Sequence, residues 1–290
     1  MTESIPRNIG DFEVISKLGN GAIGEVYKVR KPSIHGPVAL KIMHEELKYD
    51  NNLIRTFFEE VDAMSSLNHP NILLIFDKHM IDGTPAYTAQ HHPTDLRKRI
   101  NHGNLEREDL FKLAIGIASA LEYTHKKRFR HMDLKPSNVY VSEQGEAVLG
   151  DYHLVRHLEL ESEITSSGGQ GTPDYMSPEQ RWNFQHRRPS RRIDQRSDIY
   201  SFGVLLYEMA TGSLPKGGYQ PISEHRSDLP KGLDQVVEKS FAEKPEQRYQ
   251  DASEVVRDLK MLRSGRSLQG KRSWHTFSEK AVIAAAVVAG

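Results

Sequence analysis

The stretch His131-Met132-Asp133-Leu134-Lys135-Pro136-Ser137-Asn138 decides the interpretation of this chain. It places a carboxylate, an ammonium group and a carboxamide within six residues, and Pro136 stiffens the backbone between them. Phosphoryl transfer needs such groups: a carboxylate that accepts a hydroxyl proton, a cation near the migrating phosphate and an oxygen ligand for Mg²⁺. The stretch alone does not establish that chemistry, which also requires groups that bind the phosphates.

The composition excludes several other classes of protein. The 290 residues include 39 basic and 39 acidic side chains, so the chain has no net charge that would favour binding to nucleic acid or to a membrane surface. The absence of cysteine excludes disulfides, thiolate metal sites and a cysteine nucleophile. The fourteen histidines have no repeated ligand spacing, and we interpret them as surface, capping or core residues. We expect residues 1–10 to form a polar tail that is neither a signal peptide nor the start of a membrane helix.

A glycine-rich run lies between two predicted strands, residues 12–15 and 25–29. In the run Gly19-Asn20-Gly21-Ala22-Ile23-Gly24, the glycines allow the backbone to lie close over phosphates with its N–H groups facing the anion. A dinucleotide-binding turn would need a helix directly after the glycines, whereas the β-branched and aromatic residues at 26–29 favour a strand. An ordinary glycine-rich hairpin is the alternative.

A lysine lies within the next predicted strand, Val38-Ala39-Leu40-Lys41-Ile42. Because lysine is rarely buried unless paired, we expect Lys41 to meet an anion. An amphipathic helix follows at about residues 52–67 and carries Glu60. A lysine at a strand edge and a solvated glutamate are the alternatives. Two further strands, residues 72–76 and 85–89, complete an expected five-stranded sheet.

Helices and a hairpin surround the opening stretch. Residues 110–125 have the periodicity of an amphipathic helix, and residues 139–141 and 147–149 predict a hairpin that ends at Asp151-Tyr152-His153. Residues 194–212 are mostly apolar but too interrupted by polar residues to span a membrane, which predicts a buried core helix. A last helix is expected at residues 254–262.

Taken in order over residues 11–262, these motifs resemble the protein kinase family. The opening stretch is similar to the catalytic loop, with Met132 where arginine is usual, and Asp151-Tyr152-His153 occupies the position of Asp-Phe-Gly. Residues 171–179 resemble the end of an activation segment. Residues 229–234 and 245–252 look most like bacterial receptor-type (eukaryotic-like) Ser/Thr kinases.

The resemblance implies an α+β, two-lobed protein-kinase fold. Its small N-lobe would hold an antiparallel sheet with one main helix, and its larger C-lobe would be mainly helical. We expect an N-terminal tail at residues 1–10, the N-lobe at 11–90 and the C-lobe at 91–262. A basic juxtamembrane linker at 263–280 and an apolar segment at 281–290 would follow.

The resemblance also implies roles for individual residues. Asp133 would be the base, Lys135 would stabilise charge on the γ-phosphate, and Lys41, paired with Glu60, would hold the α- and β-phosphates of ATP. Asn138 and Asp151 would hold Mg²⁺, with Mn²⁺ as a substitute. The residues expected to contact the nucleotide are Gly19, Asn20, Gly21, Gly24, Val26, Ala39 and Lys41.

Further expectations concern the support of the loop. Asp198 would accept N–H bonds from the catalytic loop, and Arg248 would form a buried ion pair with Glu179. The thioether of Met132 cannot bind a phosphate group as an arginine side chain can. Phosphorylation of Thr165, Ser166 or Ser167 is therefore not expected to activate the protein strongly through position 132. His153 in place of glycine would restrict the orientation of Asp151.

The sequence thus predicts a Ser/Thr kinase that transfers the γ-phosphate of Mg-ATP to protein hydroxyls in bacterial signalling. The alternative is a pseudokinase, a nucleotide-binding scaffold with little or no phosphotransfer, which Met132 and His153 favour. A small-molecule phosphotransferase fits less well, because the long activation segment suits peptide substrates. The partners would be a protein substrate and a second copy in a dimer, and no nucleic acid.

The C-terminus leads to a separate expectation. Residues 281–290 contain no polar side chain and follow the basic residues Lys271 and Arg272. At about 1.5 Å per residue, ten helical residues cover roughly 15 Å, which is half the hydrocarbon thickness of a bilayer. A frayed alanine-rich tail is one interpretation. We favour a truncated membrane helix that holds the cytoplasmic kinase domain at the inner face of the membrane.

Overall fold

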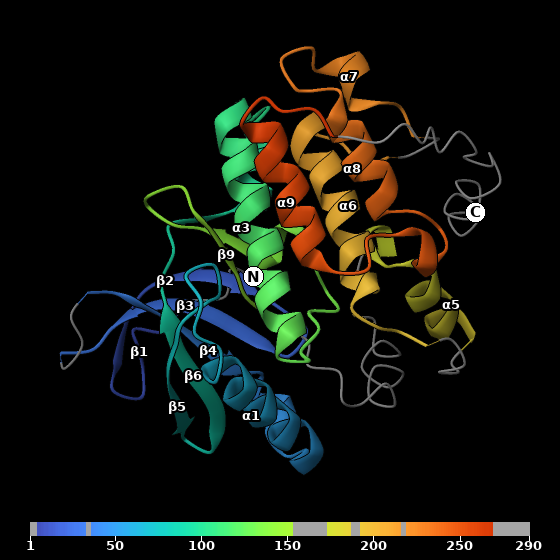
Figure 1. The fold of residues 1–290 in the computed structure, drawn as a ribbon. Helices are drawn as coiled ribbons and strands as arrows, with labels where there is room; N and C mark the ends of the chain where they lie inside the picture. Colours follow the sequence, from blue (N-terminus) through green and yellow to red (C-terminus); the bar gives the residue numbers. More distant parts are fainter. Residues whose placement is uncertain (1–4, 33–35, 153–172, 187–191, 216–218, 269–290) are drawn as a thin grey trace, which may run out of the picture. The chain divides into compact units, whose positions relative to one another are not determined.

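The computed structural model describes residues 5–32, 36–152, 173–186, 192–215 and 219–268 (Figure 1). The chain divides into two compact units, Met1–His92 and Pro93–Gly290. His153, the candidate phosphosites at 165–167 and the apolar residues 281–290 lie outside the described residues. No helix in the described ranges has both the length and the apolar character that a membrane crossing requires.

The first unit is built on a six-stranded antiparallel sheet in the order β1-β2-β3-β4-β6-β5. Five strands were expected, and the additional strand is β1, whose Ile9 pairs with Phe12 across a turn at Gly10. The strands are β1 (Asn8–Ile9), β2 (Phe12–Asn20), β3 (Gly24–Arg30), β4 (Val38–Met43), β5 (Ile75–Ile81) and β6 (Thr84–Gln90).

The strand predicted at residues 72–76 was placed wrongly, because β5 begins only at Ile75. Ile72 and Leu73 are buried without belonging to a strand, each about 5% exposed. Their apolar character therefore reflects packing into the core more than membership of a strand, and Ile72 also forms an isolated β-bridge. A short apolar run does not distinguish the two causes.

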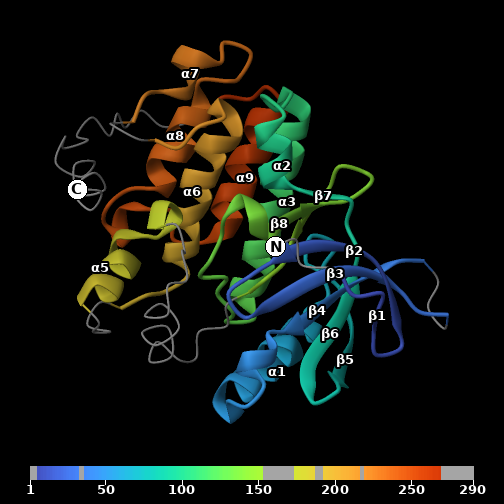
Figure 2. The same cartoon turned by 180° about the vertical axis from the view of Figure 1, so that it is seen from behind.

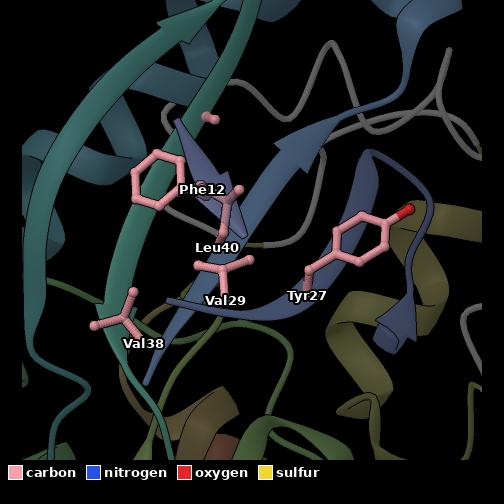
Figure 3. Packing of buried hydrophobic residues seen from close by; sticks show 6 residues of the cluster. Phe12, Tyr27, Val29, Val38 and Leu40 are labelled. Carbon is pink, nitrogen blue, oxygen red and sulfur yellow. The ribbon is translucent and has the colours of Figure 1, made fainter. Parts of the chain in front are cut away.

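The alternation of side chains along β3 and β4 separates the two faces of this sheet. Tyr27 pairs with Leu40 and Val29 pairs with Val38, so these four side chains share one face. Together with Phe12 they belong to one buried cluster (Figure 3). The side chains one residue along each strand lie on the opposite face, and these include the candidate site residues Val26, Ala39 and Lys41.

Helix α1 (Asn51–Ser65) is capped by Asp50, whose side chain accepts hydrogen bonds from the backbone N–H groups of Asn52 at 2.8 Å and Leu53 at 3.2 Å. This N-cap satisfies donors that the first helical turn leaves unpaired. The helix buries Phe57, with Val61 and Met64 one and two turns further on. It is preceded by the short 3₁₀ helix η1 (Glu45–Leu47).

The second unit is mainly helical. Helices α3 (Arg107–Lys126), α6 (Arg196–Thr211), α8 (Gly232–Ser240) and α9 (Ala252–Arg263) lie side by side (Figure 1). Helix α6 is buried from Ser197 to Ala210, which confirms the predicted core helix. The shorter helices are α2 (Leu96–Asn101), α5 (Pro178–His186), α7 (Ile222–His225), η2 (Pro136–Asn138), η4 (Pro173–Tyr175) and η5 (Pro245–Gln247).

A small antiparallel sheet in the second unit carries the residues that follow the opening stretch. It consists of β7 (Thr94–Asp95), β8 (Val139–Val141) and β9 (Ala147–Leu149), and α2 packs beside β7 and β8 (Figure 2). The predicted hairpin is confirmed, with Val139 opposite Leu149 and Val141 opposite Ala147. A sheet unit with one main helix and a mainly helical unit agree with the predicted α+β fold.

Candidate active site

The main chain of the opening stretch is held by a buried carboxylate. Asp198, which is 1% exposed, accepts the N–H of His131 at 2.9 Å and the N–H of Met132 at 2.8 Å. This confirms the predicted role of Asp198. Gln180 donates from Nε2 to the Met132 carbonyl at 2.9 Å. Met132 has a φ of 67°, a left-handed conformation that costs roughly 1–2 kcal/mol for a residue with a Cβ.

Asp198 remains ionised although it is buried. Burial alone would raise its pKa, but the hydrogen bond from His125 Nε2 at 2.9 Å and the Met132 N–H together hold the pKa below its ordinary value. A charged acceptor makes stronger hydrogen bonds to backbone N–H groups than a neutral one. The charge therefore stabilises the strained backbone at Met132.

The three polar groups of the stretch meet at one carboxylate oxygen. Lys135 Nζ lies 2.6 Å from Asp133 Oδ2, and Asn138 Nδ2 donates to the same oxygen at 2.9 Å and to the Asp133 carbonyl at 2.8 Å. The side chains of Asp133 and Lys135 are each 28% exposed, so a substrate can reach them. The structure thus brings together the carboxylate, the ammonium group and the carboxamide.

His131 connects the loop to the end of β9. Its Nε2 lies 3.0 Å from the Gly150 carbonyl, and its Nδ1 lies 3.3 Å from the Asp133 N–H. A neutral ring with the proton on Nε2 satisfies both contacts. The ring also packs on Tyr152 at a centroid distance of 4.5 Å, which confirms that tyrosine serves here as a packing ring.

The Tyr152 side chain is almost fully buried, with 2% exposure. Burial raises the pKa of its hydroxyl well above the ordinary value. The phenol is therefore neutral and acts through packing rather than through charge.

Asn138 and Asp151, the candidate metal ligands, lie at the open end of the β8–β9 hairpin. The Gly150 N–H donates to the Asn138 carbonyl at 3.0 Å and links the two chain segments at this end. Asp151 has a φ of 49° and accepts a hydrogen bond from the Tyr140 hydroxyl at 3.0 Å. One carboxylate and one amide oxygen suit Mg²⁺, which usually takes one or two carboxylates together with substrate phosphates and waters.

No cluster of three or more histidine, aspartate or glutamate side chains that could hold a metal ion occurs among the described residues. An all-protein metal cage is therefore absent from that part of the chain. The two oxygen donors of the hairpin fit an ion that is shared with a phosphate substrate.

A buried ion pair supports the segment after η4. Arg248 contacts Glu179 with both terminal nitrogens, Nη1 to Oε1 at 2.7 Å and Nη2 to Oε2 at 2.9 Å. Ser197 donates to the same carboxylate at 2.6 Å. Arg248 is 2% and Glu179 5% exposed, which confirms the predicted buried pair.

The first unit presents the other candidates on one face of its sheet. Lys41 pairs with Val26 on β3 and with Tyr87 on β6, and Ala39 lies two residues before it. Residues directly opposite in antiparallel strands share a face, as do residues two apart in one strand. Val26, Ala39 and Lys41 therefore lie on the face opposite the buried cluster.

Helix α1 packs on this same face. Phe57 meets Tyr87 with ring centroids 5.7 Å apart, and Lys41 Nζ lies 6.0 Å from the Tyr87 ring centre. Glu60 follows Phe57 by three residues and is half-buried. Residues three apart lie on one side of a helix, so this arrangement favours the predicted pair of Lys41 and Glu60, which stays a prediction.

The glycine-rich run occupies the end of β2, the turn and the start of β3. The Gly21 N–H donates to the Gly24 carbonyl at 2.9 Å, and His44 Nε2 lies 2.8 Å from the Gly21 carbonyl. A Cβ on Gly24 would lie 2.1 Å from the Ile42 carbonyl oxygen, whereas a Cβ on Gly19 would meet nothing within 4 Å. The sheet itself therefore requires glycine at 24, and the nucleotide-binding roles predicted for the run stay predictions.

Three residues near the loop were missed by sequence reasoning. Gln180 and His125 reach Met132 and Asp198 from segments distant in the sequence, and no local pattern marks them. Tyr140 had a signal, because it alternates with two buried valines and so belongs to the other face of β8.

Known proteins resemble this chain over most of its length. Residues 12–267 match the family described as the protein kinase domain. A probable serine/threonine-protein kinase of Clostridium perfringens, CPE1738, is 28% identical over 87% of this chain and 38% of its own length. The serine/threonine-protein kinase PknB of Mycobacterium tuberculosis is 31% identical over 90% of this chain and 44% of its own length. The chain thus spans about two fifths of the length of these curated relatives.

Solved structures agree in fold. The kinase domain of Mycobacterium tuberculosis PknI has a TM-score of 0.68 at 23% identity, over 89% of this chain and 99% of that one. The predicted resemblance to bacterial Ser/Thr kinases is confirmed by the relatives, and nothing in the comparisons favours a pseudokinase. This chain belongs to the protein kinase family.

Proposed function

We propose that this domain transfers the γ-phosphate of ATP to serine and threonine hydroxyls of proteins. The observation that carries the proposal is the convergence of Lys135 and Asn138 on Asp133 Oδ2, at 2.6 Å and 2.9 Å. Relatives named serine/threonine-protein kinases over 87–90% of this chain support the same reaction.

Asp133 acts as the general base in this proposal. As the substrate hydroxyl oxygen forms its bond to the γ-phosphorus, its proton passes to the Asp133 carboxylate. The bond between the γ-phosphorus and the β,γ-bridging oxygen breaks, and ADP leaves with the electron pair. A carboxylate has two oxygens and about four lone-pair sites, so the contacts at Oδ2 are compatible with proton transfer. The Lys135 ammonium group stabilises the charge on the transferred phosphate.

Other residues bind and orient the nucleotide. Lys41, supported by Glu60, binds the α- and β-phosphates, and the glycine-rich run offers backbone N–H groups to them. Val26 and Ala39 contact the nucleotide from the same face of the sheet as Lys41. Asn138 and Asp151 would hold Mg²⁺, or Mn²⁺ in its place. When bound, the ion neutralises charge on the phosphates.

The proposal is tested with purified protein, ATP labelled at the γ-phosphate and a generic basic protein. We expect label on the basic protein or on the chain itself, and a fall of at least about a hundred-fold in Lys41→Met. That fall corresponds to about 2.7 kcal/mol of lost transition-state stabilisation. Lys126→Met is the matched control, because this lysine is exposed and pairs with Glu122 on the surface of α3.

The control should retain wild-type activity, and both variants should keep the wild-type unfolding midpoint. A wild-type protein that binds nucleotide but stays silent with Mg²⁺ and with Mn²⁺ would establish the scaffold alternative instead.

Attachment to a membrane is a further part of the proposal. Residues 281–290 carry no polar side chain, and Lys271 and Arg272 before them can contact anionic headgroups. We expect the chain to sediment with vesicles that contain anionic lipid, and a chain that ends at residue 268 to stay in the supernatant. Equal sedimentation of the two forms would exclude residues 269–290 as a membrane anchor.

A further inference from the structure

We infer that Tyr140 is a positioning residue that holds the Asp151 carboxylate in place for the metal ion. The inference rests on the proposed function of this site, because it assigns Asp151 as a ligand of Mg²⁺. It concerns a side chain for which neither the motifs of the sequence nor the comparisons provide a role.

The geometry of the β8–β9 hairpin carries the first step. Tyr140 lies between Val139 and Val141, which are buried, so its side chain leaves the strand on the opposite face. From there its hydroxyl reaches Asp151 Oδ2 at 3.0 Å. The strand alternation therefore points the phenol at Asp151, the second residue after the end of the partner strand β9.

The backbone of Asp151 supplies the second step. Its φ of 49° lies in the left-handed region, which aspartate tolerates better than most residues but seldom adopts. Such a conformation persists where several contacts hold it. The contacts here include the Gly150 N–H bond to the Asn138 carbonyl at 3.0 Å and the Tyr140 bond to the carboxylate.

The chemistry of a metal-ligating carboxylate supplies the third step. An ionised carboxylate accepts through two oxygens, so one hydrogen bond from a phenol leaves capacity for an ion. Hydrogen bonds from surrounding groups orient such ligands, and their loss typically costs 10- to 100-fold in metal affinity. Phenylalanine at position 140 would keep the ring and lose only the donor.

The same contact permits a different outcome that can be measured. If the Tyr140 hydroxyl competed with the ion for Asp151 Oδ2, removing it would strengthen metal binding. The two cases predict opposite signs for one substitution.

The experiment measures how strongly Mg²⁺ tightens ATP binding, by calorimetric titration with and without the ion. We expect Tyr140→Phe to reduce this metal effect about ten-fold while metal-free ATP binding stays at the wild-type value. Tyr49→Phe is the matched control, because Tyr49 is 79% exposed and lies in the other unit. Thermal unfolding of both variants checks that the fold is retained.

A double variant tests whether Tyr140 acts through Asp151. Asp151→Asn should itself weaken the metal effect, and adding Tyr140→Phe to it should cause no further loss. An undiminished metal effect in Tyr140→Phe, a stronger one, or the full ten-fold loss repeated in the Asp151→Asn background would each overturn the inference. So would a wild-type protein whose ATP binding does not respond to Mg²⁺.

Binding is measured without phosphotransfer, so this inference and the proposed function can fail separately. A protein that transfers no phosphate, but whose Mg²⁺-dependent ATP binding is weakened in Tyr140→Phe, would support the inference and contradict the proposed kinase reaction. An active kinase with an unchanged metal effect in Tyr140→Phe would do the reverse.

Discussion

Replacing Asp133 by asparagine is expected to lower phosphotransfer by about 10²- to 10⁴-fold, the contribution typical of a general base. An amide has nearly the shape of the carboxylate, so Lys135 and Asn138 retain a neighbour of similar size. It cannot take up the hydroxyl proton at neutral pH. The measurement is the initial rate of label transfer from ATP under saturating nucleotide.

Asp109→Asn is the matched control for this substitution. Asp109 belongs to the same unit, is about half exposed and pairs with Arg99 at 2.9 Å on the surface of α3. We expect this variant to keep the wild-type rate, and Asp133→Asn to bind ATP with wild-type affinity. A rate for Asp133→Asn within ten-fold of the wild type would exclude Asp133 as the base.

Replacing Arg248 by methionine is expected to lower the free energy of unfolding by about 3–5 kcal/mol, because it leaves the Glu179 carboxylate charged and buried. Arg248 also donates to three backbone carbonyls, those of Ala242, Glu243 and Arg196, at 2.8–3.0 Å. The loss therefore reaches α6 and the segment before η5. Urea unfolding followed by circular dichroism measures it.

Two comparisons identify the cause of that loss. Arg257→Met removes the ion pair between an exposed arginine and Asp258, which keeps its hydrogen bond from Tyr249, and should cost no more than about 1 kcal/mol. Adding Glu179→Gln to Arg248→Met removes the stranded charge and should recover part of the stability. No recovery in the double variant would mean that the carbonyl contacts of Arg248, and not the buried charge, dominate.

The same pair makes stability depend on pH. Burial would raise the pKa of Glu179, but hydrogen bonding and charge from Arg248, with the Ser197 hydroxyl, hold it below its ordinary value of 4.5. The folded form therefore binds this proton less readily than the unfolded form. The contribution of the Glu179 carboxylate to stability is present above about pH 4.5, the pKa of the unfolded form. It is lost as the pH falls from there through the lower pKa of the folded form. In Arg248→Met this acid-dependent contribution should disappear.

Much of the fold and part of the site were predictable because they follow from local patterns. The apolar run of α6 predicts burial, and the alternation in β3 and β4 predicts which side chains share a face with Lys41. The contacts of Asp198 and Arg248 were expected from their motifs and are confirmed.

The remainder depends on long-range packing that no local pattern contains. Strand β5 begins late because Ile72 and Leu73 pack into the core. Strand β1 is the exception, because its pairing of Ile9 with Phe12 is local. The contact of Gln180 with Met132 joins residues 48 positions apart, and that of His125 with Asp198 joins residues 73 apart. Hydrogen bonds of this kind depend on the finished fold, so a single sequence does not indicate them.

The left-handed backbone at Met132 has a consequence for how the chain can diverge. Its N–H is bonded to Asp198 and its carbonyl to Gln180, so the main chain alone fixes the loop at this point. Mutational drift at position 132 is therefore limited by backbone conformation more than by side-chain chemistry. Unbranched residues such as methionine are admitted, and β-branched ones are resisted at a φ of 67°. A search for working kinases that demands arginine at this position would discard sequences whose catalytic loop is held in the same way.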